Sequence, residues 1–254
     1  RNAAVLNLYL QCYTQEEIAE RVGMPRPTVE KLLIKIGKYE IGSIPGLFAE
    51  AMPEDGAPER VKKEAEETRQ LKIIDENRRN AEHSLDFSVP IYNVWKQQNK
   101  TEGPEHFGNS EIRWLDNLLY LYTQPFDIVI DTFAGSGTSL DICRKRLRRC
   151  WLSDRLPIEE REREIRNLDL TEELPDLRKR WSEAKLIYLD PPYWKQSAGK
   201  YSDDPTDLAN MDLALFNKTL SKIITDFSRK LTCGYIALLM QPTQWNSPER
   251  EFTD

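Results

Sequence analysis

The stretch Asp190-Pro-Pro-Tyr193 combines residue types that are able to hold a planar substrate at the end of a strand. It directly follows the apolar run 186–190, which is typical of a buried strand. Pro191 and Pro192 have no backbone N–H and stiffen the chain, so the Asp190 carboxylate and a bare carbonyl are both presented as acceptors. Two acceptors and the flat ring of Tyr193 suit a planar ligand that carries an exocyclic amino group. A strand-terminal turn with an edge tyrosine is the simpler alternative.

A glycine-rich turn, 133–138 with the sequence FAGSGT, is the second stretch that is suited to contact a ligand. It lies between the β-branched run 126–131, a predicted buried strand, and the run 140–147, a predicted helix. Gly135 and Gly137 allow a sharp turn, and the helix N-terminus offers free N–H groups to a ligand. Together these elements predict the front half of a nucleotide-binding βαβ unit. The turn alone lacks the full G-x-G-x-x-G pattern and is still compatible with a dinucleotide dehydrogenase.

Further strands and helices follow the glycine-rich turn in alternation. Strands are predicted at 149–153, 186–190 and 235–240, with another ending at Asp169, and helices at 110–123 and 210–230. This alternation indicates an α/β fold with a doubly wound, mostly parallel, Rossmann-like sheet. Because the carboxyl ends of parallel strands meet at one edge, the sequence predicts a group of carboxylates there: Asp131, Asp154, Asp169 and Asp190. Asp154 stands where such folds bind a ribose diol.

The N-terminal residues predict two helices joined by a short glycine-containing turn. Thr14 and Glu17 form the pattern of a capping box, and Gly23 is a helix breaker before a second helix at 26–36. This is the helix-turn-helix plan, and 13–38 resembles the helix-turn-helix of ParB-like and transcription-regulator proteins. Base or phosphate contacts are then expected from the second helix, at Arg26, Thr28, Glu30, Lys31 and Lys35. An ordinary helical hairpin with a solvated basic face is the alternative.

Composition limits the other possibilities. The net charge of -6 means that any nucleic-acid surface is local. The four cysteines are scattered and only two histidines could supplement them, so no metal is expected and the thiols are predicted to be reduced. No apolar run is long enough to span a bilayer and no signal peptide opens the chain, so we expect a cytoplasmic protein without membrane contact. Arg1 in place of Met indicates a fragment or a processed chain.

The glycine-rich turn and the Asp190 tetrad together resemble the cofactor and catalytic motifs of S-adenosylmethionine-dependent amino methyltransferases of DNA. The resemblance extends over about 87–239 and includes HFGNSEIRWLDNLL before the turn. With the N-terminal helices, it resembles phage and bacterial methyltransferases that carry ParB-type domains. It implies three parts: a helix-turn-helix domain at 1–40, a charged helical linker at 41–84 and a methyltransferase domain at 85–254. Double-stranded DNA is the implied partner, and a homodimer is left open.

The resemblance also implies roles for particular residues. Asp190, Pro191, Pro192 and Tyr193 would be catalytic, with both acceptors on the target amino group and Tyr193 stacked on the flipped base. S-adenosylmethionine would be the cofactor, with Asp154 on its ribose and Asp169 on its adenine. The rest of the implied cofactor site comprises Asp131, Phe133, Ala134, Gly135, Ser136, Gly137 and Thr138, with His106 and Asn109 lining the methionine pocket. DNA contacts beyond the tetrad are expected from Trp194, Lys195, Lys200 and Tyr201.

Adenine N6 is the favoured acceptor, because Asp opens the tetrad and the cytosine members of the family often have Ser there. The alternatives are cytosine N4, an RNA or protein substrate, and a non-catalytic ParB-like DNA-binding protein on a methyltransferase scaffold. Two departures from the family pattern stand out: no recognition domain fits between the two motifs, and no clear candidates remain for two further strands after 235–240. The loop 195–210 is expected to close over the target or to be a mobile surface loop, and the basic run 144–149 to be a solvated helix end.

Overall fold

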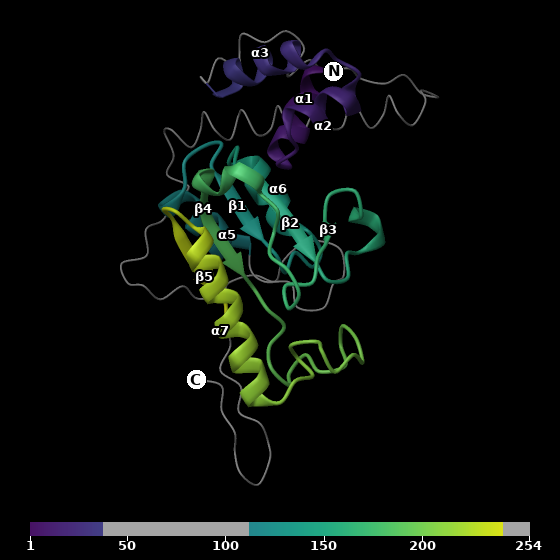
Figure 1. Ribbon diagram of the computed structural model, residues 1–254, viewed down its shortest axis with the longest axis vertical. Coiled ribbons are helices and arrows are strands. Elements are labelled where there is room, and N and C mark those ends of the chain that lie inside the picture. The colour runs from purple at the N-terminus through teal and green to yellow at the C-terminus, as the bar shows by residue number, and fades with distance from the viewer. Residues whose placement is uncertain (38–111, 241–254) are drawn as a thin grey trace. The chain divides into compact units, whose positions relative to one another are not determined.

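The structure is a computed structural model and describes residues 1–37 and 112–240 (Figure 1). The predicted linker at 41–84 and two predicted cofactor residues, His106 and Asn109, lie outside the described residues. The chain divides into two units. Within the described residues, the first unit contains 1–37, 116–128 and 140–151, and the second contains 112–115, 129–139 and 152–240.

The first unit begins with the helices α1 (Asn2–Leu10), α2 (Gln15–Val22) and α3 (Arg26–Gly37). The predicted capping box is present, because the Thr14 side chain accepts from the Glu17 amide and the Glu17 carboxylate accepts from the Thr14 amide at 2.7 Å. Gly23 ends α2 in the left-handed conformation, at φ 61°. The predicted helices are therefore confirmed at α2 and α3, and capping at both ends explains the length of α2.

The apolar faces of α1–α3 form a core with Phe126 and Leu147, two residues from later parts of this unit. The buried residues of α3 pack with Phe126 and Leu147. The rings of Tyr9 and Phe126 lie 6.0 Å apart, and the Arg149 guanidinium lies 5.0 Å from the centre of the Tyr9 ring. The three helices are thus held to this unit by apolar packing and by a cation–π contact. The core residues on α3 are Val29, Leu32, Leu33 and Ile36.

The sheet confirms the predicted α/β class. Its strands are β1 (Ile128–Asp131), β2 (Arg149–Asp154), β3 (Arg166–Asn167), β4 (Ala184–Leu189) and β5 (Tyr235–Leu238). They follow the order β3-β2-β1-β4-β5, and the neighbouring pairs β2–β3 and β4–β5 are parallel (Figure 1). β1 is buried along its whole length, as its β-branched composition predicts. The order reverses at β1, which makes the sheet doubly wound.

Three helices accompany the sheet: α5 (Ile112–Tyr122), α6 (Thr138–Lys145) and α7 (Leu213–Lys230). α6 begins and ends two residues earlier than predicted, because the turn leads directly into it and Leu147 adopts a left-handed φ of 53°. α7 begins at Leu213 rather than near 210, because the Asp212 carboxylate accepts from the Leu215 amide at 2.8 Å and caps the helix there.

The basic run 144–149 is not a solvated helix end, so that prediction is wrong. Arg148 is buried and donates to the carbonyls of Leu119 and Thr123 and to the Thr123 hydroxyl. Arg149 donates from Nε to the Phe126 carbonyl at 2.6 Å. These carbonyls belong to the last turn of α5 and the segment after it, and that of Leu119 also accepts from the Thr123 amide at 3.1 Å. The arginines satisfy those acceptors, which explains their burial.

Candidate functional site

Acidic residues end three neighbouring strands of the sheet. Asp131 is the last residue of β1, Asp154 is the last residue of β2, and Asp190 follows β4 directly. In the strand order, β1 lies between β2 and β4, and the chain passes from β1 first to β2 and later to β4. This is a topological switch point, where open parallel sheets bind their ligands. Three members of the predicted group, Asp131, Asp154 and Asp190, therefore lie at the edge where the fold favours a site.

Two of these carboxylates shape the glycine-rich turn. The Asp131 Oδ1 atom accepts from the Phe133 amide at 3.0 Å, and the Asp154 Oδ2 atom accepts from the Gly135 amide at 2.9 Å. Gly135 and Gly137 both have positive φ, 49° and 76°, a conformation that favours glycine. The acids at the ends of β1 and β2 thus hold the turn that joins β1 to α6.

Arg161 covers the second glycine of the turn, and sequence analysis did not identify it. A Cβ atom on Gly137 would lie 2.6 Å from Arg161 Nη1. That nitrogen donates to the Gly137 carbonyl and, at 3.4 Å, to the Ser136 carbonyl, while Nε pairs with Glu164 at 3.2 Å. Gly137 is therefore required both by its conformation and by the close approach of this side chain. The hydroxyls of Ser136 and Thr138 lie 2.8 Å apart on the same turn.

Asp131 holds its proton near neutral pH. Burial, and to a smaller extent the negative charges of Asp190 and Asp154, raise the pKa of its carboxyl to about 7. The hydrogen bond from the Phe133 amide acts in the opposite direction. The mutual influence of the three acids shows that they share one electrostatic environment. A cationic ligand at this edge would be favoured by them.

Trp194, which follows the tetrad, is a core residue and not a surface aromatic. Its side chain is 1% exposed, and its Nε1 donates to the Met211 carbonyl at 3.0 Å. The prediction that it contacts DNA is therefore corrected, because the indole ring packs with Leu208, Met211, Phe216 and Leu220. Phe133 of the glycine-rich turn packs against the same cluster. The cluster connects the turn after β1 with the chain after β4.

The segment after the tetrad, 195–210, is tied to itself by polar side chains. The Asn210 Nδ2 atom donates to the carbonyls of Ser202 and Asp204 at 2.9 and 2.8 Å. Asp207 is buried and accepts from the Ser202 hydroxyl at 3.0 Å. The Lys195 Nζ atom donates to the Asn210 carbonyl at 3.4 Å, whereas the Lys200 side chain is exposed. These contacts lie within the segment and hold its first and last residues together.

Tyr201 brings this segment to the group of carboxylates. Its side chain is half-buried, and burial together with the charges of Asp190, Asp154 and Asp207 raises the pKa of its phenol to about 12. Tyr201 therefore lies within electrostatic reach of two strand-end acids. Tyr193, also half-buried, accepts from the Ser197 amide through its carbonyl at 3.1 Å.

Asp169 lies two residues beyond β3, so it does not end that strand as predicted. Its Oδ1 atom accepts from the amide and the hydroxyl of Thr171 at 2.8 and 2.7 Å. Its Oδ2 atom pairs with Arg155 Nε at 3.0 Å. Arg155, a second residue that sequence analysis did not identify, also reaches Asp204 in the segment after the tetrad. The sequence signal that could have identified Arg155 is its position next to Asp154, a predicted site residue.

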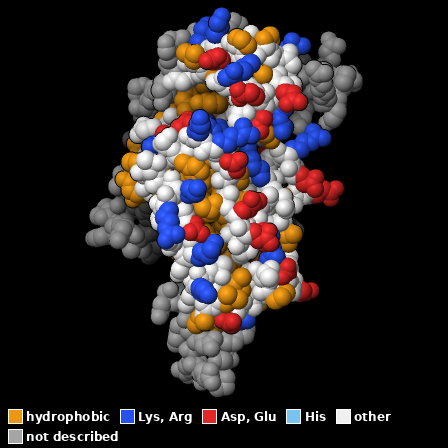
Figure 2. All heavy atoms as spheres, viewed as in Figure 1, with side chains coloured by type: hydrophobic (Ala, Val, Ile, Leu, Met, Phe, Trp, Pro, Cys, Tyr) orange, Lys and Arg blue, Asp and Glu red, His pale blue; other side chains and the backbone are white. Residues whose placement is uncertain are grey.

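The predicted DNA contacts of α3 lie in the first unit, on the face of the helix away from its core. Arg26, Thr28, Glu30, Lys31 and Lys35 are all exposed. Arg26 pairs with Glu16 of α2 at 3.0 Å. On the face seen in Figure 2, the described basic and acidic side chains are interspersed. A role in DNA binding would therefore depend on a local cluster of basic side chains, such as the one on the exposed face of α3.

Among residues 1–37 and 112–240, no group of three or more His, Cys, Asp or Glu side chains is placed to hold a metal ion. In the same part of the chain, no helix is long and apolar enough to cross a membrane.

A family model described as DNA methylase matches residues 28–164. The matched stretch contains the glycine-rich turn and Asp154, and it ends before Asp169 and the Asp190 tetrad. The comparisons with curated proteins and with solved structures found no match.

Proposed function

The chain belongs to this DNA methylase family, and on that premise we propose that it transfers a methyl group from S-adenosylmethionine to the exocyclic amino group of a flipped DNA base, adenine N6. Family membership supports DNA amino methyltransferase activity. The methyl donor, the choice of adenine and the roles of individual residues are the proposal. The observation that carries it is the convergence of Asp131, Asp154 and Asp190 at the switch point beside the glycine-rich turn.

The residues at this edge fit the proposed cofactor. S-adenosylmethionine, when bound, supplies a methyl group on a positively charged sulfur atom. The carboxylates of Asp154 and Asp190 favour such a cation. Gly135 and Gly137 both adopt the positive φ that favours glycine in the turn beside them. We propose that the turn holds the methionine part, that Asp154 accepts from the ribose hydroxyls, and that Asp169 accepts from the adenine amino group.

The tetrad would act on the acceptor base. An exocyclic amino nitrogen is a poor nucleophile because its lone pair is delocalised into the ring. The Asp190 carboxylate and the Pro191 carbonyl would accept its two hydrogens, which favours a pyramidal nitrogen and stabilises the positive charge that develops on it. Tyr193 would stack on the base, which must leave the duplex to reach these groups. Asp at the first position of the tetrad favours adenine over cytosine.

Transfer of label identifies the product. The protein is incubated with methyl-labelled S-adenosylmethionine and double-stranded DNA of mixed sequence, and the DNA is digested to nucleosides. We expect label in N6-methyl-2′-deoxyadenosine. Label in N4-methyl-2′-deoxycytidine would show that the target base is cytosine, and label only in RNA or in protein offered in parallel would refute a DNA substrate.

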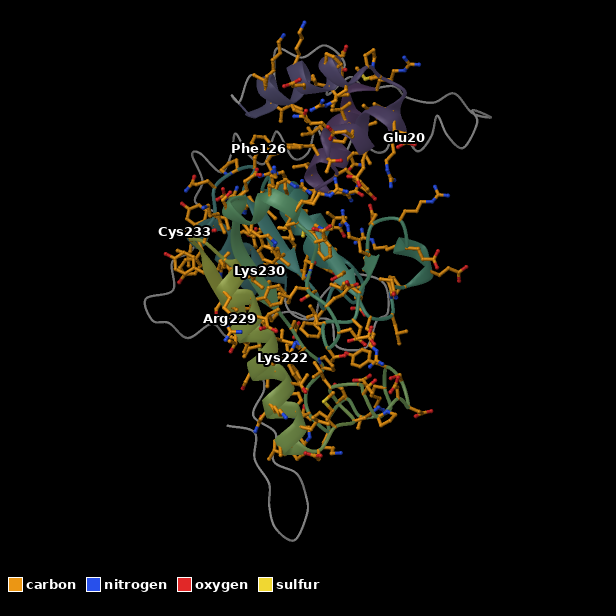
Figure 3. All side chains as sticks on the ribbon, viewed as in Figure 1. Glu20, Phe126, Lys222, Arg229, Lys230 and Cys233 are labelled. Atoms are coloured by element: carbon orange, nitrogen blue, oxygen red, sulfur yellow. The ribbon has the colours of Figure 1, made fainter. Side chains whose placement is uncertain are left out.

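We propose that the exposed face of α3 contacts the phosphates of the substrate DNA. The double variant Lys31→Ala/Lys35→Ala should weaken binding about equally for all sequences, because phosphate contacts carry little sequence information. The slope of log affinity against log salt should fall by about 1 for each lysine, since each releases about one counterion. Lys222→Ala is the control, because this lysine lies on α7 and pairs with Asp226 (Figure 3). An unchanged slope in the double variant would show that Lys31 and Lys35 of α3 do not contact the DNA phosphates.

A further inference from the structure

We propose that Arg155 is a positioning residue that fastens the segment after the tetrad, 195–210, to Asp169. Binding of the cofactor's adenine at Asp169 would thereby be coupled to the ordering of this segment. This inference rests on the proposed function for the identity of the two ligands. The fastening itself rests only on contacts within the second unit. Asp169 lies beyond β3 and Asp204 lies between the tetrad and α7, so Arg155 joins two stretches that are distant in the chain.

Arg155 is well placed to join them. Its backbone continues β2, and its carbonyl accepts from the Asn167 side chain at 2.8 Å. Nε pairs with the Asp169 carboxylate at 3.0 Å, while Nη2 donates to the Asp204 carboxylate at 2.8 Å and to the Thr206 hydroxyl at 2.7 Å. The planar guanidinium holds these donors in a fixed fork, so its two carboxylate partners are held in a fixed relation to each other.

The Asp204 end of this contact is rigid within its own segment. Its Oδ1 atom accepts from the amide and the hydroxyl of Thr206 at 2.8 and 2.7 Å, and its carbonyl accepts from Asn210. These Thr206 bonds, more than the charge of Arg155, lower the pKa of the Asp204 carboxyl, which is therefore ionised at neutral pH. Arg155 thus holds the turn at Asp204 by a charge-assisted bond.

The Asp169 end faces the proposed adenine site. Two of its hydrogen bonds come from Thr171 and use Oδ1, and Oδ2 is the atom that pairs with Arg155. An adenine amino group that donates to this carboxylate would hold Asp169 in place and, through it, Arg155 and Asp204. Tyr201 belongs to the segment that Arg155 fastens and is influenced by the charges of Asp190 and Asp154. The segment is also joined to the tetrad, because the Ser197 amide donates to the Tyr193 carbonyl at 3.1 Å, so its ordering would help to fix Tyr193.

Trypsin cleavage after Lys200 measures the fastening directly, because this exposed lysine lies within the segment. The full chain is digested without cofactor or DNA, and the product that ends at Lys200 is followed by mass spectrometry. Arg155→Ala should be cleaved about fivefold faster than the wild type, the ratio expected when about 1 kcal/mol of local stability is lost. Arg229→Ala is the matched control, because this arginine on α7 is 75% exposed in its side chain and lies 3.6 Å from Asp226 (Figure 3).

The coupling is tested by adding S-adenosylhomocysteine, which carries the same adenine. It should slow cleavage after Lys200 in the wild type and have little effect on the rate in Arg155→Ala. Asp204→Asn provides a second variant, because it removes the charge at the far end and leaves Arg155 and Asp169 in place. It should also lose the protection by S-adenosylhomocysteine. Circular dichroism verifies that each variant is folded.

Two results would overturn the proposal: wild-type cleavage rates in both Arg155→Ala and Asp204→Asn, or equal protection by S-adenosylhomocysteine in the wild type and in the variants. Steady-state kinetics add an independent readout, since loss of the fastening should raise the KM for DNA more than it changes kcat. If the wild type transfers no methyl group to DNA, the proposed function fails, but the cleavage rates without ligand still decide whether Arg155 fastens the segment.

Discussion

Asp190→Asn will reduce methyl transfer to DNA by about 10²- to 10³-fold while cofactor binding is retained. The substitution keeps the size of the side chain but replaces one carboxylate oxygen with an NH₂ group. The carboxamide keeps one acceptor oxygen, but the negative charge that stabilises the developing positive charge is lost. Removal of one such transition-state contact typically has an effect of about this size. The fall should appear in kcat and in kcat/KM alike, because the contact strengthens in the transition state.

The measurement combines single-turnover transfer of labelled methyl with calorimetric binding of S-adenosylhomocysteine. Asp203→Asn is the matched control, because it makes the same chemical change at an exposed position in the segment after the tetrad. It should leave the rate within about twofold of the wild type, as surface substitutions usually do. A wild-type rate in Asp190→Asn would show that the tetrad does not act on the amino group as proposed.

The free energy of unfolding of the wild type should fall as the pH rises toward 7 because of Asp131, and the variant Asp131→Asn should lack this fall. Burial raises the pKa of Asp131 to about 7 in the folded chain, whereas the unfolded chain has the ordinary value of 3.8. Above pH 3.8 the unfolded state therefore loses the proton first, and the folded state binds more protons until about pH 7. The free energy of unfolding accordingly falls between these two pH values, by at most about 4 kcal/mol from this group, and is flat with respect to it above pH 7.

Asparagine has nearly the same shape and does not titrate, and its Oδ1 can still accept from the Phe133 amide. Urea unfolding is measured for both proteins from pH 4 to pH 8, and the difference between them isolates Asp131. We expect the variant to gain stability relative to the wild type as the pH rises, with the difference levelling off above about pH 7. A difference that does not change with pH would mean that Asp131 is ionised in the folded chain throughout this range.

The sequence by itself determined the elements and their order, because their causes are local. The capping box at Thr14, the left-handed Gly23 and the β-branched strand before Asp131 each act over a few residues, and the structure has these elements where they were predicted. The alternation of strands and helices then implied a parallel sheet with its acids at one edge. Only the ends of elements differed, as at α6, where a left-handed residue follows the helix.

The tertiary structure alone decided which polar and amphipathic side chains are buried and what they bind. Trp194 and Arg148 are residue types often found at surfaces, yet both are buried, because a carbonyl from a distant part of the chain accepts their N–H groups. Arg161 at Gly137, and Arg155 between Asp169 and Asp204, depend in the same way on partners brought near by folding. Long side chains reach acceptors that have no fixed spacing in the sequence, so no periodic pattern reveals them. The glycines and acids of the site were thus readable from the sequence, while the arginines that hold it together were not.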